Sequence, residues 1–134
     1  MRFEAVVKVL ACVATFYLIT PTVPLSAQEK VGVQGWARDS FGRIIFDWPR
    51  PAKYRAIIKG QDLVVSFDRR FNSDFEELLS TLKDYISSVA TSDQGRVASF
   101  SLKNNFQLRT YPRGNSIILD LRRIQKSKNN DQIP

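Results

Sequence analysis

Apolar and polar residues alternate with a period of two along two stretches of this chain, which is the pattern of strands with one buried face. The apolar positions of the first stretch include Ile44, Phe46, Leu63, Val65 and Phe67. Pro49 and Pro51 interrupt it, because proline donates no hydrogen bond to a sheet, and Gly60 suits a tight turn. The pattern predicts three strands, over residues 44–48, 53–59 and 63–68.

The second stretch repeats the first at a constant offset of 54 residues. Residues 46–69 align without a gap with residues 100–123, so that Phe46 matches Phe100 and Gly60 matches Gly114. Agreement of this length favours an internal duplication. We therefore expect two similar three-stranded antiparallel meanders, the second with strands over residues 97–102, 106–111 and 116–122.

Between the two copies the apolar spacing changes to the three- and four-residue intervals of a helix. The predicted buried face consists of Phe75, Leu79, Leu82 and Ile86. Ser73 followed by Glu76 has the spacing of a capping box. These features predict an amphipathic helix over residues 73–90. The expected fold class is mainly β with one helix (α+β), in which the two meanders pack with the connecting helix in a sandwich-like arrangement.

The first 27 residues have the three-part layout of a secretory signal peptide. Basic residues at the start precede an apolar run from Val9 to Ile19, which is shorter than the about 20 residues that a membrane span needs. Cleavage is expected near Ala27, which places the mature protein in the periplasm or outside the cell, with no need for membrane contact.

Three further boundaries follow. Residues 28–40 are predicted to be a lead-in segment or an extra edge strand, and residues 41–124 a single duplicated domain. Residues 125–134 contain almost nothing to bury and are predicted to be a disordered tail.

Composition narrows the chemistry that this chain can perform. Its one cysteine lies within the predicted signal peptide, and it has no histidine. Zinc binding and catalysis by a Ser-His or Cys-His pair are therefore nearly excluded. Asp47, Asp68 and Asp120 lie on predicted strands and are interpreted as surface charges. We predict a non-catalytic domain without metal or cofactor.

The chain is basic, with a net charge of +7, and removal of the leader leaves 18 basic and 12 acidic residues, a net charge of +6. In an exported protein this charge favours an anionic polymer or protein partner over nucleic acid, although it can also serve solubility alone. The candidate binding residues are Trp48, Lys53, Arg55, Arg109 and Tyr111. Arg55 and Arg109 match each other in the duplication, guanidinium groups suit carboxylates and phosphates, and aromatic rings can stack on sugars. The alternative is an ordinary solvated strand face whose basic residues discourage edge pairing.

The two strands that follow the turn glycines carry a resemblance to a known family. DLVVSF at residues 62–67, after Gly60, and SIILDL at residues 116–121, after Gly114, resemble the closing strands of the AMIN domain. AMIN domains are β-rich periplasmic modules of Gram-negative bacteria, built from two similar halves, and the resemblance covers residues 41–123. It implies a cell-envelope module that binds peptidoglycan or targets a partner to the envelope. The alternative is a periplasmic protein-interaction or assembly module that acts by strand addition or through a surface patch.

Overall fold

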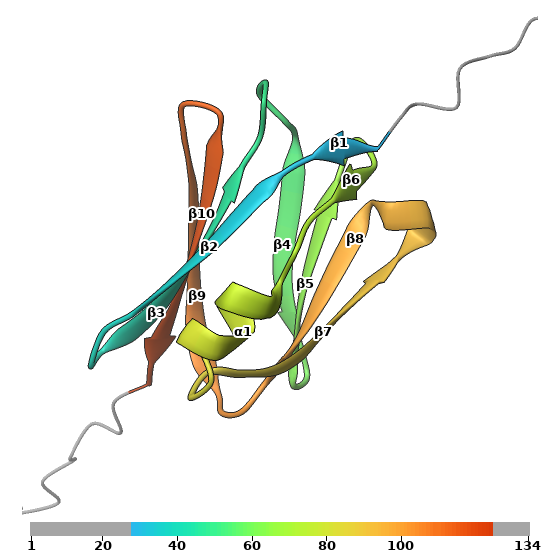
Figure 1. Ribbon diagram of the computed structural model, residues 1–134. Helices are drawn as coiled ribbons and strands as arrows, with labels where there is room; N and C mark the ends of the chain where they lie inside the picture. Colours follow the sequence, from blue (N-terminus) through green and yellow to red (C-terminus); the bar gives the residue numbers. More distant parts are fainter. Residues whose placement is uncertain (1–27, 125–134) are drawn as a thin grey trace, which may run out of the picture.

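The computed structural model describes residues 28–124, so the predicted signal peptide and the predicted tail lie outside the described residues. Two four-stranded antiparallel sheets pack against each other with the apolar core between them (Figure 1). The predicted fold class, mainly β with one helix and sandwich-like, is confirmed.

Each sheet is described by its strand order. The first sheet, in spatial order, consists of β2 (Gly32–Ala37), β3 (Phe41–Asp47), β10 (Ser116–Arg123) and β9 (Phe106–Arg113). The second sheet consists of β4 (Tyr54–Lys59), β5 (Asp62–Phe67), β8 (Val97–Leu102) and β7 (Ile86–Ser92). The remaining elements are the short parallel pair β1 (Glu29–Lys30) and β6 (Phe71–Asn72), the helix α1 (Glu76–Thr81) and the 3-10 turn η1 (Asp93–Gly95).

The inner faces of both sheets supply the core at alternate strand positions. Its fully buried members include Ile44, Phe46, Leu63, Val65, Phe100, Leu119 and Leu121. Burial of an apolar side chain of this size stabilises a fold by about 1.5–3 kcal/mol. Phe46 packs edge-to-face against Phe67 and Phe71, with ring centroids 5.1 and 6.1 Å away. The apolar alternation in the sequence therefore identified the inner faces.

The register of the strands shows the internal duplication directly. Phe46 pairs with Ile117 between β3 and β10, and Phe100 pairs with Leu63 between β8 and β5. Adding 54 to Phe46 and subtracting 54 from Ile117 converts the first pair into the second. The two halves are thus related by a pseudo-twofold axis that exchanges the two sheets.

The predicted three-stranded meanders are wrong in one respect, because the first strand of each copy does not pair with the hairpin that follows it. Instead, β3 pairs with β10 of the second copy, and β8 pairs with β5 of the first. The proline-containing segment 49–51 carries the chain from the first sheet to the second, since proline cannot continue a ladder. This exchange lets both copies share one core.

The predicted helix over residues 73–90 is also wrong in extent, because α1 spans only Glu76–Thr81 and residues 86–92 form β7. Ser73 does not cap the helix; its hydroxyl donates to the carbonyl of Val31 at 2.7 Å, and Asp74 accepts from the amide of Glu76. Leu82 and Ile86 are buried as predicted, whereas Phe75 and Leu79 are only partly buried. The serine, threonine and β-branched residues of 86–92 are weak helix formers, and pairing with β8 decides their conformation.

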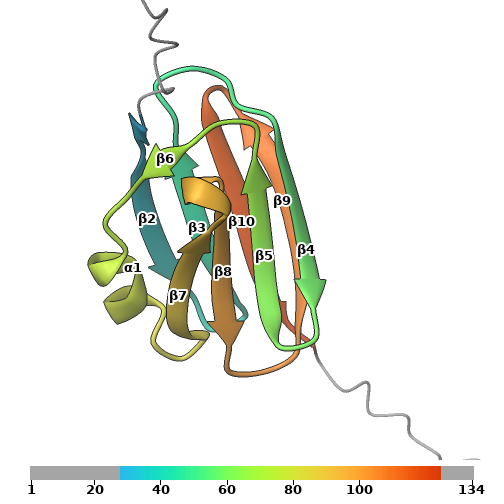
Figure 2. The same cartoon turned by 90° about the vertical axis from the view of Figure 1, so that its right-hand side faces the viewer.

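The predicted lead-in segment is ordered, since residues 28–40 contain β1 and β2. α1 lies beside β2 and β7 on one side of the sandwich, and β4 and β9 lie together on the other side (Figure 2). Within residues 28–124, no helix has the length and apolar character that a membrane crossing requires.

Candidate functional site

The outer face of the first sheet carries arginine and aromatic side chains. We call this surface the arginine-aromatic face; its residues are Trp36, Phe41, Arg43, Ile45, Arg109, Tyr111, Ile118 and Asp120. The strand alternation places them outward, because their neighbours Ile44, Phe46 and Leu119 fill the core. Trp36 is 48% exposed, which is unusual for a side chain of its size.

One row of this face crosses all four strands. Trp36 is opposite Arg43, Arg43 is opposite Asp120, and Asp120 is opposite Arg109. Arg43 grips Asp120 with two hydrogen bonds, from Nε to Oδ1 at 2.7 Å and from Nη2 to Oδ2 at 3.1 Å. Asp120, interpreted from sequence as a surface charge, is only 3% exposed and forms a largely buried ion pair. The hydrogen bond to Asp120 raises the pKa of Arg43, so this guanidinium stays charged and fixed in position.

Aromatic rings support the guanidinium groups of the face. Arg43 lies 5.3 Å from the ring centroid of Phe41, and Arg109 lies 5.8 Å from that of Tyr111. Arg38, just beyond β2, lies 5.6 Å from the ring of Trp36. Such cation–π contacts hold an arginine over an apolar ring without pairing its charge with a carboxylate. The face therefore combines positive charge with aromatic surface.

The middle of the face is apolar. Ile45, Ile118 and Tyr111 form a neighbouring row across β3, β10 and β9. Ile118 is only 3% exposed although it points away from the core, because the longer side chains around it cover it. At the end of the face where β3 begins and β10 ends there is a hollow, lined by Ser40, Phe41, Gln107, Arg122, Arg123 and Ile124.

The opposite face of the sandwich provides an internal comparison. The pseudo-twofold axis places Ser92, Val97, Ser66 and Arg55 of the second sheet where the first sheet has Trp36, Arg43, Asp120 and Arg109. Both rows satisfy the same backbone pairing, and only the arginine is common to them. The tryptophan and the buried ion pair are therefore not required by the fold itself.

The residues predicted as a binding site do not form one site. Arg109 and Tyr111 lie on the arginine-aromatic face, whereas Arg55 and Lys53 lie on or beside β4 on the opposite outer face. Because the duplication exchanges the two sheets, matching residues point in opposite directions. Arg55 and Arg109 are thus both exposed, as expected, but cannot contact the same small ligand.

Trp48 belongs to the core. It is 4% exposed and packs against Phe67, with ring centroids 4.9 Å apart, while Arg69 covers its other side at 5.0 Å. Its ring is not available to stack on a sugar. The prediction that Trp48 takes part in binding is corrected by this burial.

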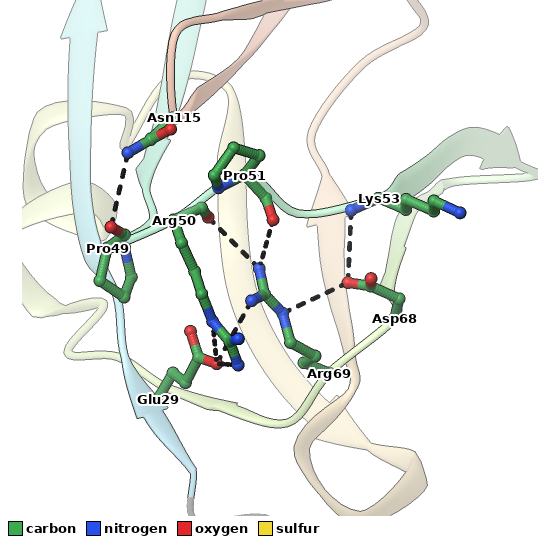
Figure 3. A network of polar contacts seen from close by, with 8 residues as sticks. All are labelled: Glu29, Pro49, Arg50, Pro51, Lys53, Asp68, Arg69 and Asn115. Carbon is green, nitrogen blue, oxygen red and sulfur yellow. Dashed lines mark hydrogen bonds and ion pairs between the residues drawn. The ribbon is translucent and has the colours of Figure 1, made fainter.

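A second group of charges, shown in Figure 3, has a structural role. Arg69 donates to the carbonyl of Pro51 at 2.8 Å and lies 3.4 Å from Glu29 and 3.5 Å from Asp68. Arg50 donates to Glu29 from Nε at 3.0 Å, and this hydrogen bond lowers the pKa of Glu29. These contacts join β1 to the crossover 49–51, and their charges are satisfied within the domain.

Sequence reasoning missed Trp36, Phe41, Arg43 and Asp120 as site residues. Arg43 and Asp120 lie 77 positions apart. Their pairing follows from the exchange of strands between the copies. The signal that could have found them is the difference between the copies, since Val97 and Ser66 stand at the matching positions.

Comparison with known proteins is limited. No protein-family model matches the chain, and no curated protein matches it. One similar solved structure is heat shock protein 16.0 from Schizosaccharomyces pombe, which is 10% identical, with a TM-score of 0.42 over 86% of this chain and 80% of that chain. The identity and the score are too low for any function to be carried over.

These comparisons correct the family prediction. The resemblance to the AMIN domain is wrong, because no family model supports it and the structural match is to a heat shock protein. The cell-envelope functions predicted with it, peptidoglycan binding first, are wrong for the same reason. The domain is non-catalytic, as predicted. The periplasmic or secreted location stays a prediction, since residues 1–27 lie outside the described part of the chain.

Proposed function

We propose that this domain binds other polypeptides, and that its arginine-aromatic face holds an extended segment in which carboxylates alternate with aromatic or aliphatic side chains. The observation that carries this proposal is the contrast between the two faces of one duplicated fold. The same backbone needs only serine, valine and one arginine on the second sheet. The first sheet adds Trp36 and the Arg43–Asp120 pair, which cost burial of a charge.

The chemistry of the face matches such a ligand. Arginine, tryptophan and tyrosine are the residues that protein interfaces use most for affinity. Asp120 and the ring of Phe41 hold Arg43 in place, so a bound carboxylate meets a guanidinium that has little rotational freedom to lose. The net charge of +7 also attracts acidic segments at long range.

Spacing favours an extended ligand. Outward residues of the face recur at every second position along each strand. In an extended peptide, residues two apart likewise share a side, so carboxylates and aromatic rings can face the same surface in alternation. The acetylated and amidated peptide ESFSESF has this pattern, and KSFSKSF replaces both carboxylates with amines.

Titration of the full chain with fluorescently labelled ESFSESF and KSFSKSF tests the proposal by anisotropy. ESFSESF should bind, more weakly as salt is added, and KSFSKSF should not. Arg109→Glu should weaken the binding of ESFSESF by about tenfold or more, which corresponds to about 1.4 kcal/mol.

Arg55→Glu is the matched control, because it makes the same charge change at the equivalent position of the opposite face. It should leave the affinity within about twofold once the change in net charge is screened by salt. Equal loss in both variants, or equal binding of the two peptides, would show that net charge alone attracts the ligand and would contradict the proposal.

A further inference from the structure

The hollow at the end of the arginine-aromatic face has a chemistry of its own. β10 ends there and β3 and β9 begin there, so three strand ends surround it. In the sheet register Phe41 and Gln107 lie on either side of Arg122. The hollow thus continues the face and adds two arginines and an amide to it.

Arg123 is held in position below this hollow. Its Nε donates to the hydroxyl of Tyr85 at 3.4 Å, and its guanidinium lies 4.9 Å from the centroid of that ring. Tyr85 is only 1% exposed and donates in turn to the carbonyl of Arg38 at 2.8 Å. A buried, hydrogen-bonded tyrosine therefore orients the arginine before any ligand arrives.

The two arginines lack a counterion within the domain. Among residues 28–124, neither Arg122 nor Arg123 forms an ion pair with a carboxylate, although Asp39 and Asp84 are close enough to raise the pKa of Arg123. Two adjacent cations that face one hollow repel each other, and an anion placed between them relieves this repulsion. The hollow is thus suited to a small anionic group.

We propose that this hollow binds the free C-terminal carboxylate of the polypeptide held by the arginine-aromatic face, an inference that rests on the proposed function. Phe41 and Ile124, the latter 59% exposed, offer apolar surface beside the arginines. A terminal residue carries its carboxylate and its side chain on one carbon, so both groups fit this pairing. An internal acidic residue would require the chain to leave the hollow in two directions.

Two forms of one peptide, ESFSESL with a free C-terminus and ESFSESL amidated, test this inference with the full chain. The free acid should bind on the order of tenfold more tightly, as expected for charge-assisted hydrogen bonds to a carboxylate. Arg122→Gln should remove this difference and leave the affinity for the amidated peptide unchanged.

Arg113→Gln is the matched control, because Arg113 lies at the other end of β9 and should leave the difference intact. Equal affinities of the two forms for the unaltered protein would overturn the carboxylate site while the proposed function stands. An amidated ESFSESD that binds as tightly as the free acid would overturn the assignment to a chain terminus. Failure of every peptide to bind would overturn both proposals.

Discussion

Arg55 and Arg109 occupy equivalent positions in the two halves of this chain and point to opposite sides of the molecule. Each lies on the second strand of a β-hairpin unit and is opposite a residue of the next strand, Ser66 for Arg55 and Asp120 for Arg109. One half of the duplication therefore retains a plain outer surface, and the other presents the arginine-aromatic face. The relationship also supplies variant pairs in which the fold acts as its own control.

The Arg43–Asp120 pair should make a measurable contribution to stability. Asp120→Asn leaves Arg43 without its bidentate partner on a surface where Asp120 is nearly buried, and should lower the free energy of unfolding by about 2 kcal/mol. Chemical denaturation measures the change.

A double variant separates the pair from its surroundings. Arg43→Met combined with Asp120→Leu removes both charges, and should be more stable than Asp120→Asn because no unpaired buried charge remains. If the double variant loses the sum of the two single losses, Arg43 and Asp120 contribute independently and the pair is not a unit.

The contact between β2 and α1 should not tolerate an added methyl group. A Cβ on Gly35 would lie 2.7 Å from Cδ1 of Leu78 and 3.2 Å from Cγ of Leu82, both of which are fully buried. Gly35→Ala should therefore destabilise the domain by about 1–3 kcal/mol through overpacking. Gly32→Ala is the control in the same strand, since its Cβ would meet only Asp47 at 3.7 Å. Thermal unfolding of the two variants should differ clearly, and equal melting temperatures would contradict the tight packing.

The two turn glycines should respond alike to substitution. Gly60 and Gly114 have φ values of +64° and +62°, and a Cβ on either would contact nothing within 4 Å. Replacement of either by alanine should thus cost about 1 kcal/mol from the left-handed backbone alone, and asparagine should cost less. Denaturation curves of the four single variants test this. A much larger loss at one site would mean that the turns are not equivalent.

Glu29 should make stability depend on pH in the acid range. The hydrogen bond from Arg50 lowers its pKa in the folded protein below the ordinary value of 4.5. Its contribution is therefore present above pH 4.5 and is lost as the pH falls through the lower folded pKa. The melting temperature of Glu29→Gln should lie below that of the unaltered protein at pH 7 and converge with it near pH 3. A difference that does not change with pH would contradict an ionic origin.

The sequence determined the inner surfaces of this protein. Period-two alternation identified core positions such as Phe46 and Leu63, and the offset of 54 residues identified the duplication, since both depend on local pattern. It also placed Arg55 and Arg109 at matching exposed positions. What failed locally was the segment after Thr81, where the apolar spacing of Leu82, Ile86 and Val89 fits a helix and a strand equally well.

Only the tertiary structure decided which strands became neighbours. Exchange of the first strand of each copy brought Arg43 to Asp120, turned Arg55 away from Arg109 and buried Trp48 beneath Arg69. The physical reason is that strand pairing depends on contacts between residues more than 70 positions apart, and the alternation within a single strand carries no information about its partner. The core was therefore readable from local pattern, whereas the surface on which binding is proposed was created by the pairing of distant strands.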